Sequence, residues 1–161
     1  MIVSVARESV MGNKDKLPWG DYLPRDAEHF RNKTIGQIVV VGRKTWQSIS
    51  KRIRPSAGRR DIVLSTNPYL HAPGASVCSS IEPILALAES MPVFISGGAE
   101  INKIFLPFAR TIYVTRVHAY LNGKDLFPKL SFENWRKVSD EYHPADVLNK
   151  YDLTFETYVP I

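Results

Sequence analysis

The sequence predicts an α/β fold of three layers, in which a central mixed, mainly parallel sheet carries helices on both faces and antiparallel C-terminal edge strands. Apolar runs without alternation, such as Ile38–Val41 and Ile62–Leu64, are typical of strands buried on both faces. Helical segments separate these runs, and such alternation gives right-handed crossovers between parallel strands. Two β-rich segments near the end of the chain suit an antiparallel pair, Trp135–His143 and Tyr151–Val159.

The first half of the chain begins with a short apolar strand, Met1–Ala6. The next predicted element is a helix over Leu23–Thr34. Its second residue, Pro24, suits a first turn because the missing N–H has no partner there in any case. Gly42 ends the strand that follows, and Arg43–Ile49 then begins a second helix.

The second half continues the alternation of strands and helices. Apolar residues from Ile81 to Ala88 recur at i, i+3, i+4 and i+7, which predicts an amphipathic helix, and Ser80 is expected to cap it. Gly97 and Gly98 lead into a last helix that holds Ile101, Ile104 and Phe105. The strands predicted here are Ala75–Cys78, Val93–Ile95 and Thr111–Val117.

Length and composition limit the class of protein. The 161 residues, 44% of them hydrophobic, predict one domain over residues 1–161. The single cysteine, Cys78, fits a reducing compartment, and no apolar run approaches the ~20 residues of a membrane span. We therefore expect a cytoplasmic monomer with no membrane partner. The 21 Lys and Arg against 16 Asp and Glu give a net charge of +5, which indicates an anionic partner.

Three strand ends carry residues suited to phosphate. Gly42–Thr45 places two cations and a hydroxyl at a helix start, Ser65–Thr66 supplies two hydroxyls, and Gly97–Ala99 allows close backbone approach. Ligands of open α/β sheets bind beyond the carboxyl ends of the strands, so the three segments together predict a bound nucleotide. A P-loop is excluded, because in Gly36–Thr45 the apolar strand itself lies between the glycines. A G-x-G-x-x-G fingerprint is also lacking, which excludes a standard Rossmann domain.

One carboxylate stands out. Asp26 and Phe30 are four residues apart and therefore share one helix face. An acid beside an aromatic ring on an inward face is costly unless something donates a hydrogen bond to it. Taken alone, Asp26 is better explained as an acid at a helix N-terminus. Its context, with Leu17-Pro18-Trp19 before it, favours a functional role.

A series of short motifs runs along essentially the whole chain: Leu17-Pro18-Trp19, Leu23-Pro24-Arg25-Asp26 with Phe30 and Thr34, Val41–Ile49, Gly58-Arg59, Ile62–Ser65, Ser96–Ile101, Tyr113–Thr115, Phe127-Pro128 and Phe155-Glu156. In this order and spacing, the motifs resemble those of the dihydrofolate reductase family. The most specific are the Gly-Arg-Lys-Thr-Trp run and an Asp at that place in the first helix.

The resemblance implies an oxidoreductase of tetrahydrofolate biosynthesis and one-carbon metabolism. A hydride passes from NADPH to pterin C6 of 7,8-dihydrofolate, and N5 is protonated through water. Asp26 would accept hydrogen bonds from the pterin and orient it, Thr115 would join that network, and Trp19 would hold an ordered water. Leu17 would belong to the catalytic loop over the nicotinamide.

The resemblance also implies two sets of binding residues. Arg59 would clamp the substrate's glutamate carboxylate, with Arg60 as the alternative. The implied substrate pocket consists of Asp26, Ala27, Phe30, Ile49, Ile53, Arg59 and Thr115. The implied NADPH site consists of Ala6, Gly12, Gly42, Arg43, Lys44, Thr45, Leu64, Ser65, Thr66, Ser96, Gly97, Gly98, Ala99, Glu100 and Ile101. Antifolates are expected to bind in the substrate pocket.

Two alternative functions remain open. A reductase of the riboflavin-pathway type would share the architecture and NADPH, but it would not need the helix with Asp26, Phe30 and Thr34. A nucleic-acid-binding module would use the five cations Lys51, Arg52, Arg54, Arg59 and Arg60, but aromatic residues for base stacking are absent from that run. We therefore expect no nucleic-acid partner.

No metal site is predicted. The histidines are scattered without the spacing of metal ligands: His29, His71, His118 and His143.

One residue departs from the family pattern at the nicotinamide end of the cofactor site. Asn102 stands where the family usually has a tyrosine, so a phenol that would touch the cofactor is lost.

Overall fold

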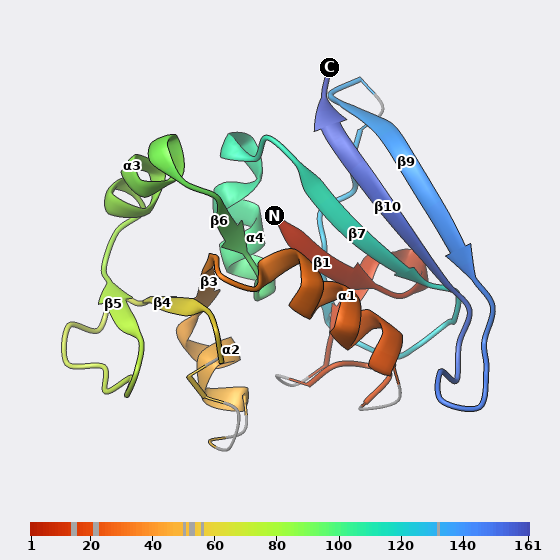
Figure 1. Ribbon diagram of the computed structural model, residues 1–161, viewed down its shortest axis with the longest axis horizontal. Coiled ribbons are helices and arrows are strands. Elements are labelled where there is room, and N and C mark those ends of the chain that lie inside the picture. Colours follow the sequence, from red (N-terminus) through yellow and green to blue (C-terminus); the bar gives the residue numbers. More distant parts are fainter. Residues whose placement is uncertain (14–15, 21–22, 50, 52–53, 56, 132) are drawn as a thin grey trace.

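The computed structural model describes residues 1–13, 16–20, 23–49, 51, 54–55, 57–131 and 133–161 (Figure 1). Its strands are β1 (Ile2–Val5), β2 (Val10–Gly12), β3 (Ile38–Gly42), β4 (Arg60–Leu64), β5 (Ser76–Cys78), β6 (Val93–Ile95), β7 (Ile112–Val117), β8 (Asp125–Leu126), β9 (Trp135–His143) and β10 (Leu153–Pro160). Its helices are α1 (Pro24–Thr34), α2 (Arg43–Ser48), α3 (Glu82–Ser90) and α4 (Ala99–Phe105), with the 3₁₀ turns Arg7–Ser9 and Leu106–Phe108.

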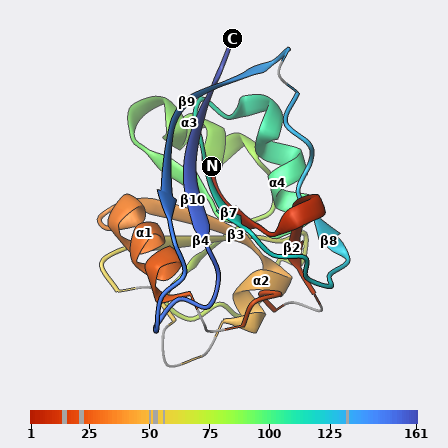
Figure 2. The same ribbon diagram turned by 90° about the vertical axis from the view of Figure 1, so that its right-hand side faces the viewer.

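Hydrogen bonding divides the main strands into two four-stranded sheets. One has the order β5-β4-β3-β6, and all its neighbours are parallel. The other has the order β1-β7-β10-β9, parallel between β1 and β7 and antiparallel beyond them. Figure 1 shows the first sheet on the left and the second on the right. Figure 2 shows α1 and α4 on opposite sides of the second sheet, as expected for layered α/β folds.

The predicted elements and the antiparallel C-terminal pair are confirmed, with one local correction. Ser80 does not cap α3, because the helix begins after Ile81 and has no side-chain cap; the Ser80 hydroxyl instead hydrogen-bonds the Glu82 carboxylate. Within α4, Phe105 is buried in the core, whereas Ile104 is exposed. None of the helices in the described part of the chain is long and apolar enough to cross a membrane.

A short ribbon of β2 and β8 was not predicted. Val10 pairs with Leu126 and Gly12 with Asp125, antiparallel and with an irregular register. Strands of three and two residues are too short to produce a recognisable hydrophobic period. The ribbon ties the segment after β1 to the segment after β7.

Three apolar clusters hold the elements together. The largest contains Val3, Val5, Val40 and Val114 and joins the two sheets through β1, β3 and β7. A second cluster packs Trp19 against Ala6, Val10, Leu23, Val117 and Leu153. A third packs α2 onto β3 and β4 through Trp46. The second cluster therefore supports the loop that connects β1 to α1.

We predict that Leu153→Ala lowers the free energy of unfolding by about 3 kcal/mol, because it opens a cavity where the side chain is 0% exposed. Leu148→Ala is the matched control, since that side chain is 69% exposed and should change the free energy by less than about 0.5 kcal/mol. Urea unfolding measures both. Equal effects of the two substitutions would contradict the assigned packing.

Candidate active site

Asp26 lies in the first turn of α1, where it faces the second sheet. The Ser4 hydroxyl of β1 donates to the Asp26 carboxylate, with Oγ 2.8 Å from Oδ1 and 2.9 Å from Oδ2. The hydroxyl of Thr115 on β7 hydrogen-bonds the same carboxylate. Ser4 and Thr115 are side by side because they are register partners in the parallel β1–β7 pair. The carboxylate thus has the donors that an acid on an inward face requires.

Burial raises the pKa of the Asp26 carboxyl above its ordinary value of 3.8. Hydrogen bonds from Thr115 and Ser4 oppose that rise because both favour the charged form. Ser4 was missed by the sequence analysis. The available signal was a single hydroxyl in an otherwise apolar strand, Ile2–Val5.

Trp19 and Leu17 have different environments although both were predicted as catalytic. Trp19 is buried against Ala6 and Leu23, so the start of α1 and the end of β1 are fixed together. Leu17 is 52% exposed. It therefore lies at the surface of the loop that precedes Trp19.

The predicted substrate residues Phe30, Ile49 and Arg59 lie together at the other end of α1. Phe30 and Ile49 pack on the apolar cluster around Trp46. The Arg59 guanidinium carbon lies 5.2 Å from the Phe30 ring centroid, and its Nε donates to Thr34 Oγ1 at 2.7 Å. Ala27 is exposed on α1.

The glycines predicted for the cofactor site meet at the carboxyl end of the first sheet. The Gly42 N–H donates to the Gly97 carbonyl at 2.8 Å. A Cβ added to Gly98 would lie 3.1 Å from Thr45 Oγ1, and one added to Gly42 would lie 2.8 Å from Ile101 Cγ1. Gly97 has φ +99°, a conformation that favours glycine. The glycines therefore allow the backbone segments after β3 and β6 to pack closely against each other.

The remaining predicted cofactor residues surround this backbone unevenly. Leu64 pairs with Gly42 across β3 and β4, so Ser65 follows directly beside the glycines. Ser96 continues β6, with its N–H donating to Val40 O at 2.9 Å. Ala99 begins α4 at the glycine turn. The exposed members of the set are Arg43, Lys44, Thr66 and Glu100. Ile53 lies outside the described residues.

Met11 and Asn102 connect the β2 segment to the glycines. Asn102 is fully buried, and its Nδ2 lies 3.7 Å from Met11 Sδ. Its Oδ1 has no hydrogen-bond partner among the described residues. A Cβ on Gly97 would be 3.7 Å from Asn102 Nδ2 and from Met11 Cε. Met11 therefore connects its neighbour Gly12 to the glycine turn at Gly97.

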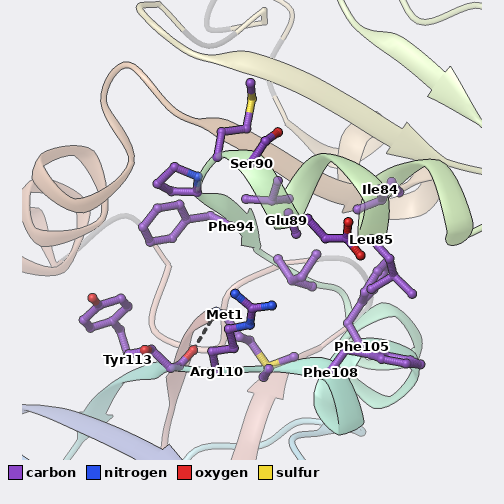
Figure 3. Close-up of a pocket in the computed structure, with 17 residues that line it drawn as sticks. Met1, Ile84, Leu85, Glu89, Ser90, Phe94, Phe105, Phe108, Arg110 and Tyr113 are labelled. Atoms are coloured by element: carbon purple, nitrogen blue, oxygen red, sulfur yellow. Dashed lines mark hydrogen bonds between the residues drawn. The ribbon is translucent and has the colours of Figure 1, made fainter.

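A cavity of about 480 Å³ lies at the opposite end of the strands (Figure 3). Figure 3 shows Phe94 and Tyr113 on one side of it and Phe105 and Phe108 on the other. It is bordered by Met1 and by the first residues of β6 and β7. No residue predicted for the site lines this cavity. The candidate site is therefore the carboxyl-end region around Asp26 and Gly97, as expected for a sheet of parallel strands.

Comparisons with known proteins address the family directly. The sequence model described as "Dihydrofolate reductase" matches residues 1–160. The chain belongs to the dihydrofolate reductase family. This finding confirms the predicted family and the predicted enzymatic activity, dihydrofolate reduction. Nothing in the comparisons favours the riboflavin-pathway alternative.

Relatives within the dihydrofolate reductase family cover nearly the whole chain. "Dihydrofolate reductase type 3" of Salmonella typhimurium is 37% identical over 98% of this chain and 94% of its own length. The Haemophilus influenzae dihydrofolate reductase is 36% identical, with 96% and 94% covered. A solved Enterococcus faecalis dihydrofolate reductase, complexed with NADP(H) and RAB-propyl, superposes with a TM-score of 0.90 at 34% identity, covering 99% of this chain and 94% of that one. The predicted fold class is therefore confirmed.

We predict that Asp26→Asn is more stable than the wild type at neutral pH. A raised pKa means that the native state holds the proton more tightly, so Asp26 lowers stability as pH rises from 3.8 through its native pKa. Asparagine does not ionise, so the variant does not lose stability as the pH rises. The unfolding free energies of the wild type and Asp26→Asn should converge at acidic pH, where Asp26 is protonated. Urea unfolding as a function of pH measures the difference.

Asp146→Asn is the control of opposite sign. Hydrogen bonds from the Asn149 side chain and from the N–H groups of Leu148 and Asn149 lower the pKa of Asp146 to about 2. Its charged form therefore stabilises the native state above its unfolded pKa, and this stabilisation is lost as pH falls towards 2. Asp146→Asn should be less stable than the wild type at neutral pH. Destabilisation by both substitutions would contradict the environment assigned to Asp26.

Proposed function

We propose that the chain reduces dihydrofolate to tetrahydrofolate with NADPH in a site where Asp26 binds the pterin. One observation carries the proposal: a single carboxylate is held on an inward face by two hydroxyls, Ser4 and Thr115. A pterin offers N–H donors on one edge, and an ionised carboxylate accepts two of them at once. Trp19, which packs with Ala6 and Leu23, would hold a water between the side chains and the substrate.

The rest of the substrate extends along α1 in this proposal. Phe30 and Ile49 present apolar surface to the aminobenzoyl ring, and Arg59 binds the glutamate carboxylate. Between the two arginines, we favour Arg59, because it lies over the Phe30 ring. Arg60 instead directs its guanidinium to Met91 Sδ, at 3.4 Å. Antifolates of the same shape and charge would bind here as well.

The residues at the glycine turn fit a dinucleotide. No side chain caps α2 or α4 within the described chain, so the N–H groups of their first turns remain for a phosphate. Glycine at positions 42 and 98 lets the end of β3, α2 and α4 approach one another closely, because a Cβ there would meet Ile101 Cγ1 or Thr45 Oγ1. We assign Lys44, Thr45 and the amides from Gly98 to Ile101 to the pyrophosphate. NADPH supplies the hydride when it is bound.

The 2′-phosphate of the cofactor requires a cationic partner, for which we propose Arg43 with Ser65 and Thr66. Arg43 is exposed and its NH1 donates to Gln47 Oε1 at 3.1 Å, which leaves further N–H groups for a phosphate. Ala6 and Gly12 would border the nicotinamide end, and Leu17 would cover it. No described acid other than Asp26 is assigned to the pterin, so water carries the proton to N5.

We further propose that residues 1–161 act as one cytoplasmic domain and as a monomer, without nucleic acid. Two cations of the 51–60 run already have partners within the fold. Arg54 donates to Trp46 O at 2.8 Å and lies over the Trp46 ring, and Arg59 binds Thr34. The same run contains no aromatic side chain on which a base could stack.

Asp26→Asn should reduce turnover of dihydrofolate at neutral pH by about a hundredfold, because the amide cannot accept both pterin N–H bonds. Part of the activity should return at low pH, where the substrate arrives protonated. The loss of reduced-nicotinamide absorbance follows the reaction. Asp152→Asn, an exposed acid on the C-terminal hairpin, is the control. Undiminished activity of Asp26→Asn would exclude Asp26 as the pterin ligand, and no turnover by the wild type would overturn the proposed function.

Arg43→Gln should raise the KM for NADPH about tenfold and leave the KM for NADH unchanged, because only NADPH carries the 2′-phosphate. Arg7→Gln removes an exposed arginine outside the proposed cofactor site, and it should change neither constant. Steady-state kinetics with the two cofactors measures the split. A parallel rise for both cofactors would place Arg43 elsewhere on the nucleotide.

A further inference from the structure

Ser4 is the one polar residue in β1, and the strand direction explains where it points. Side chains alternate across a strand, and Val3 and Val5 both enter the largest apolar cluster. Ser4 therefore lies on the opposite face, under α1, where its Oγ lies within 2.9 Å of both oxygens of Asp26. An apolar residue here would preserve the strand but remove a donor from the carboxylate.

Ser4 and Thr115 form a matched pair around Asp26. The parallel register puts them directly beside each other on β1 and β7. Each hydroxyl has one hydrogen to donate, so the two together orient the carboxylate from the strand side. In the proposed function, the N–H donors of a substrate would meet the carboxylate from the opposite side.

Charged groups on the neighbouring elements are engaged away from this carboxylate. On α1, Arg25 binds Asp146 at 2.6 Å, and the His29 ring stacks on Phe155 at 3.9 Å. Farther along α1, Glu28 pairs with Arg31 and Lys33 lies over the Tyr113 ring. On β7 and β10, Arg116 binds Glu156 at 2.7 Å. The state of Asp26 is thus governed by burial and by the two hydroxyls.

We propose that Ser4 is a positioning residue of the pterin site, whose hydroxyl fixes the orientation and charge of the Asp26 carboxylate and thereby sets its affinity for dihydrofolate. This inference rests on the proposed function of Asp26. Ser4 acts through Asp26, whereas Phe30, Ile49 and Arg59 are assigned to contact the substrate directly. The Ser4 hydroxyl is thus a second donor to the Asp26 carboxylate, in addition to the Thr115 hydroxyl.

The test replaces Ser4 and reads the carboxylate before any substrate is added. In Ser4→Ala, carboxyl NMR of the ligand-free protein should show a higher pKa for Asp26, because a donor to the charged form is lost. The KM for dihydrofolate should rise about tenfold, while the KM for NADPH stays unchanged. Ser4→Thr retains a hydroxyl and should restore both the pKa and the KM. Ser139→Ala, on exposed β9, is the matched control and should change neither.

The outcomes separate this inference from the proposed function. If the wild type reduces dihydrofolate and Ser4→Ala leaves the Asp26 pKa and the KM unchanged, the role of Ser4 is overturned. An altered pKa with an unchanged KM overturns its role in substrate affinity. A wild type that fails to turn over dihydrofolate overturns the proposed function instead. Circular dichroism checks that each variant is folded. If Ser4→Ala does not fold, Ser4→Cys, whose thiol is a weak donor of similar shape, replaces it in the same assays with the same criteria.

Discussion

The parallel pairing of β1 with β7 is the constraint on which the candidate active site depends. Its register sets Ser4 beside Thr115, so two hydroxyls face α1 at the same level. Without these hydroxyls, a buried acid in the first turn of α1 would lose its hydrogen bonds to water and form none with the protein in their place. Because β10 pairs with the other edge of β7, the C-terminal strands hold this register in place.

The helix α1 brings the two halves of the molecule into one site. Its first turn places Asp26 on the β1–β7 sheet, and one turn later Phe30 packs on the cluster of β3, β4 and α2. Across the molecule, Met11 reaches Asn102 and the glycine turn after β6. Hydrogen bonds separate the strands into two sheets, yet both sheets contribute to the region between α1 and Gly97.

The sequence predicted those parts of the candidate site that depend on local spacing. Asp26 and Phe30 follow from helical periodicity, and the glycine turns follow from their place after buried strands. Ser4 did not, because a strand buried on both faces shows no alternation that would reveal a hydroxyl's partner. The division into two sheets and the β2–β8 ribbon depend on pairings between distant segments. Ser80 was predicted as a cap from its place before the helix. In the structure its hydroxyl hydrogen-bonds the Glu82 side chain instead of a backbone N–H, which the sequence pattern does not reveal.

Two aspartates show why the site carries a local conflict. Asp146 lies in a loop where side-chain and backbone donors hold its pKa at about 2, so its charge supports the fold. Asp26 keeps a raised pKa despite two donors, because burial outweighs them. Such a residue weakens the native state whenever it is ionised. Stability alone would favour an uncharged residue at this position. The N–H groups of a bound substrate would complete the hydrogen bonding of the carboxylate, so an acid on this inward face serves binding rather than folding.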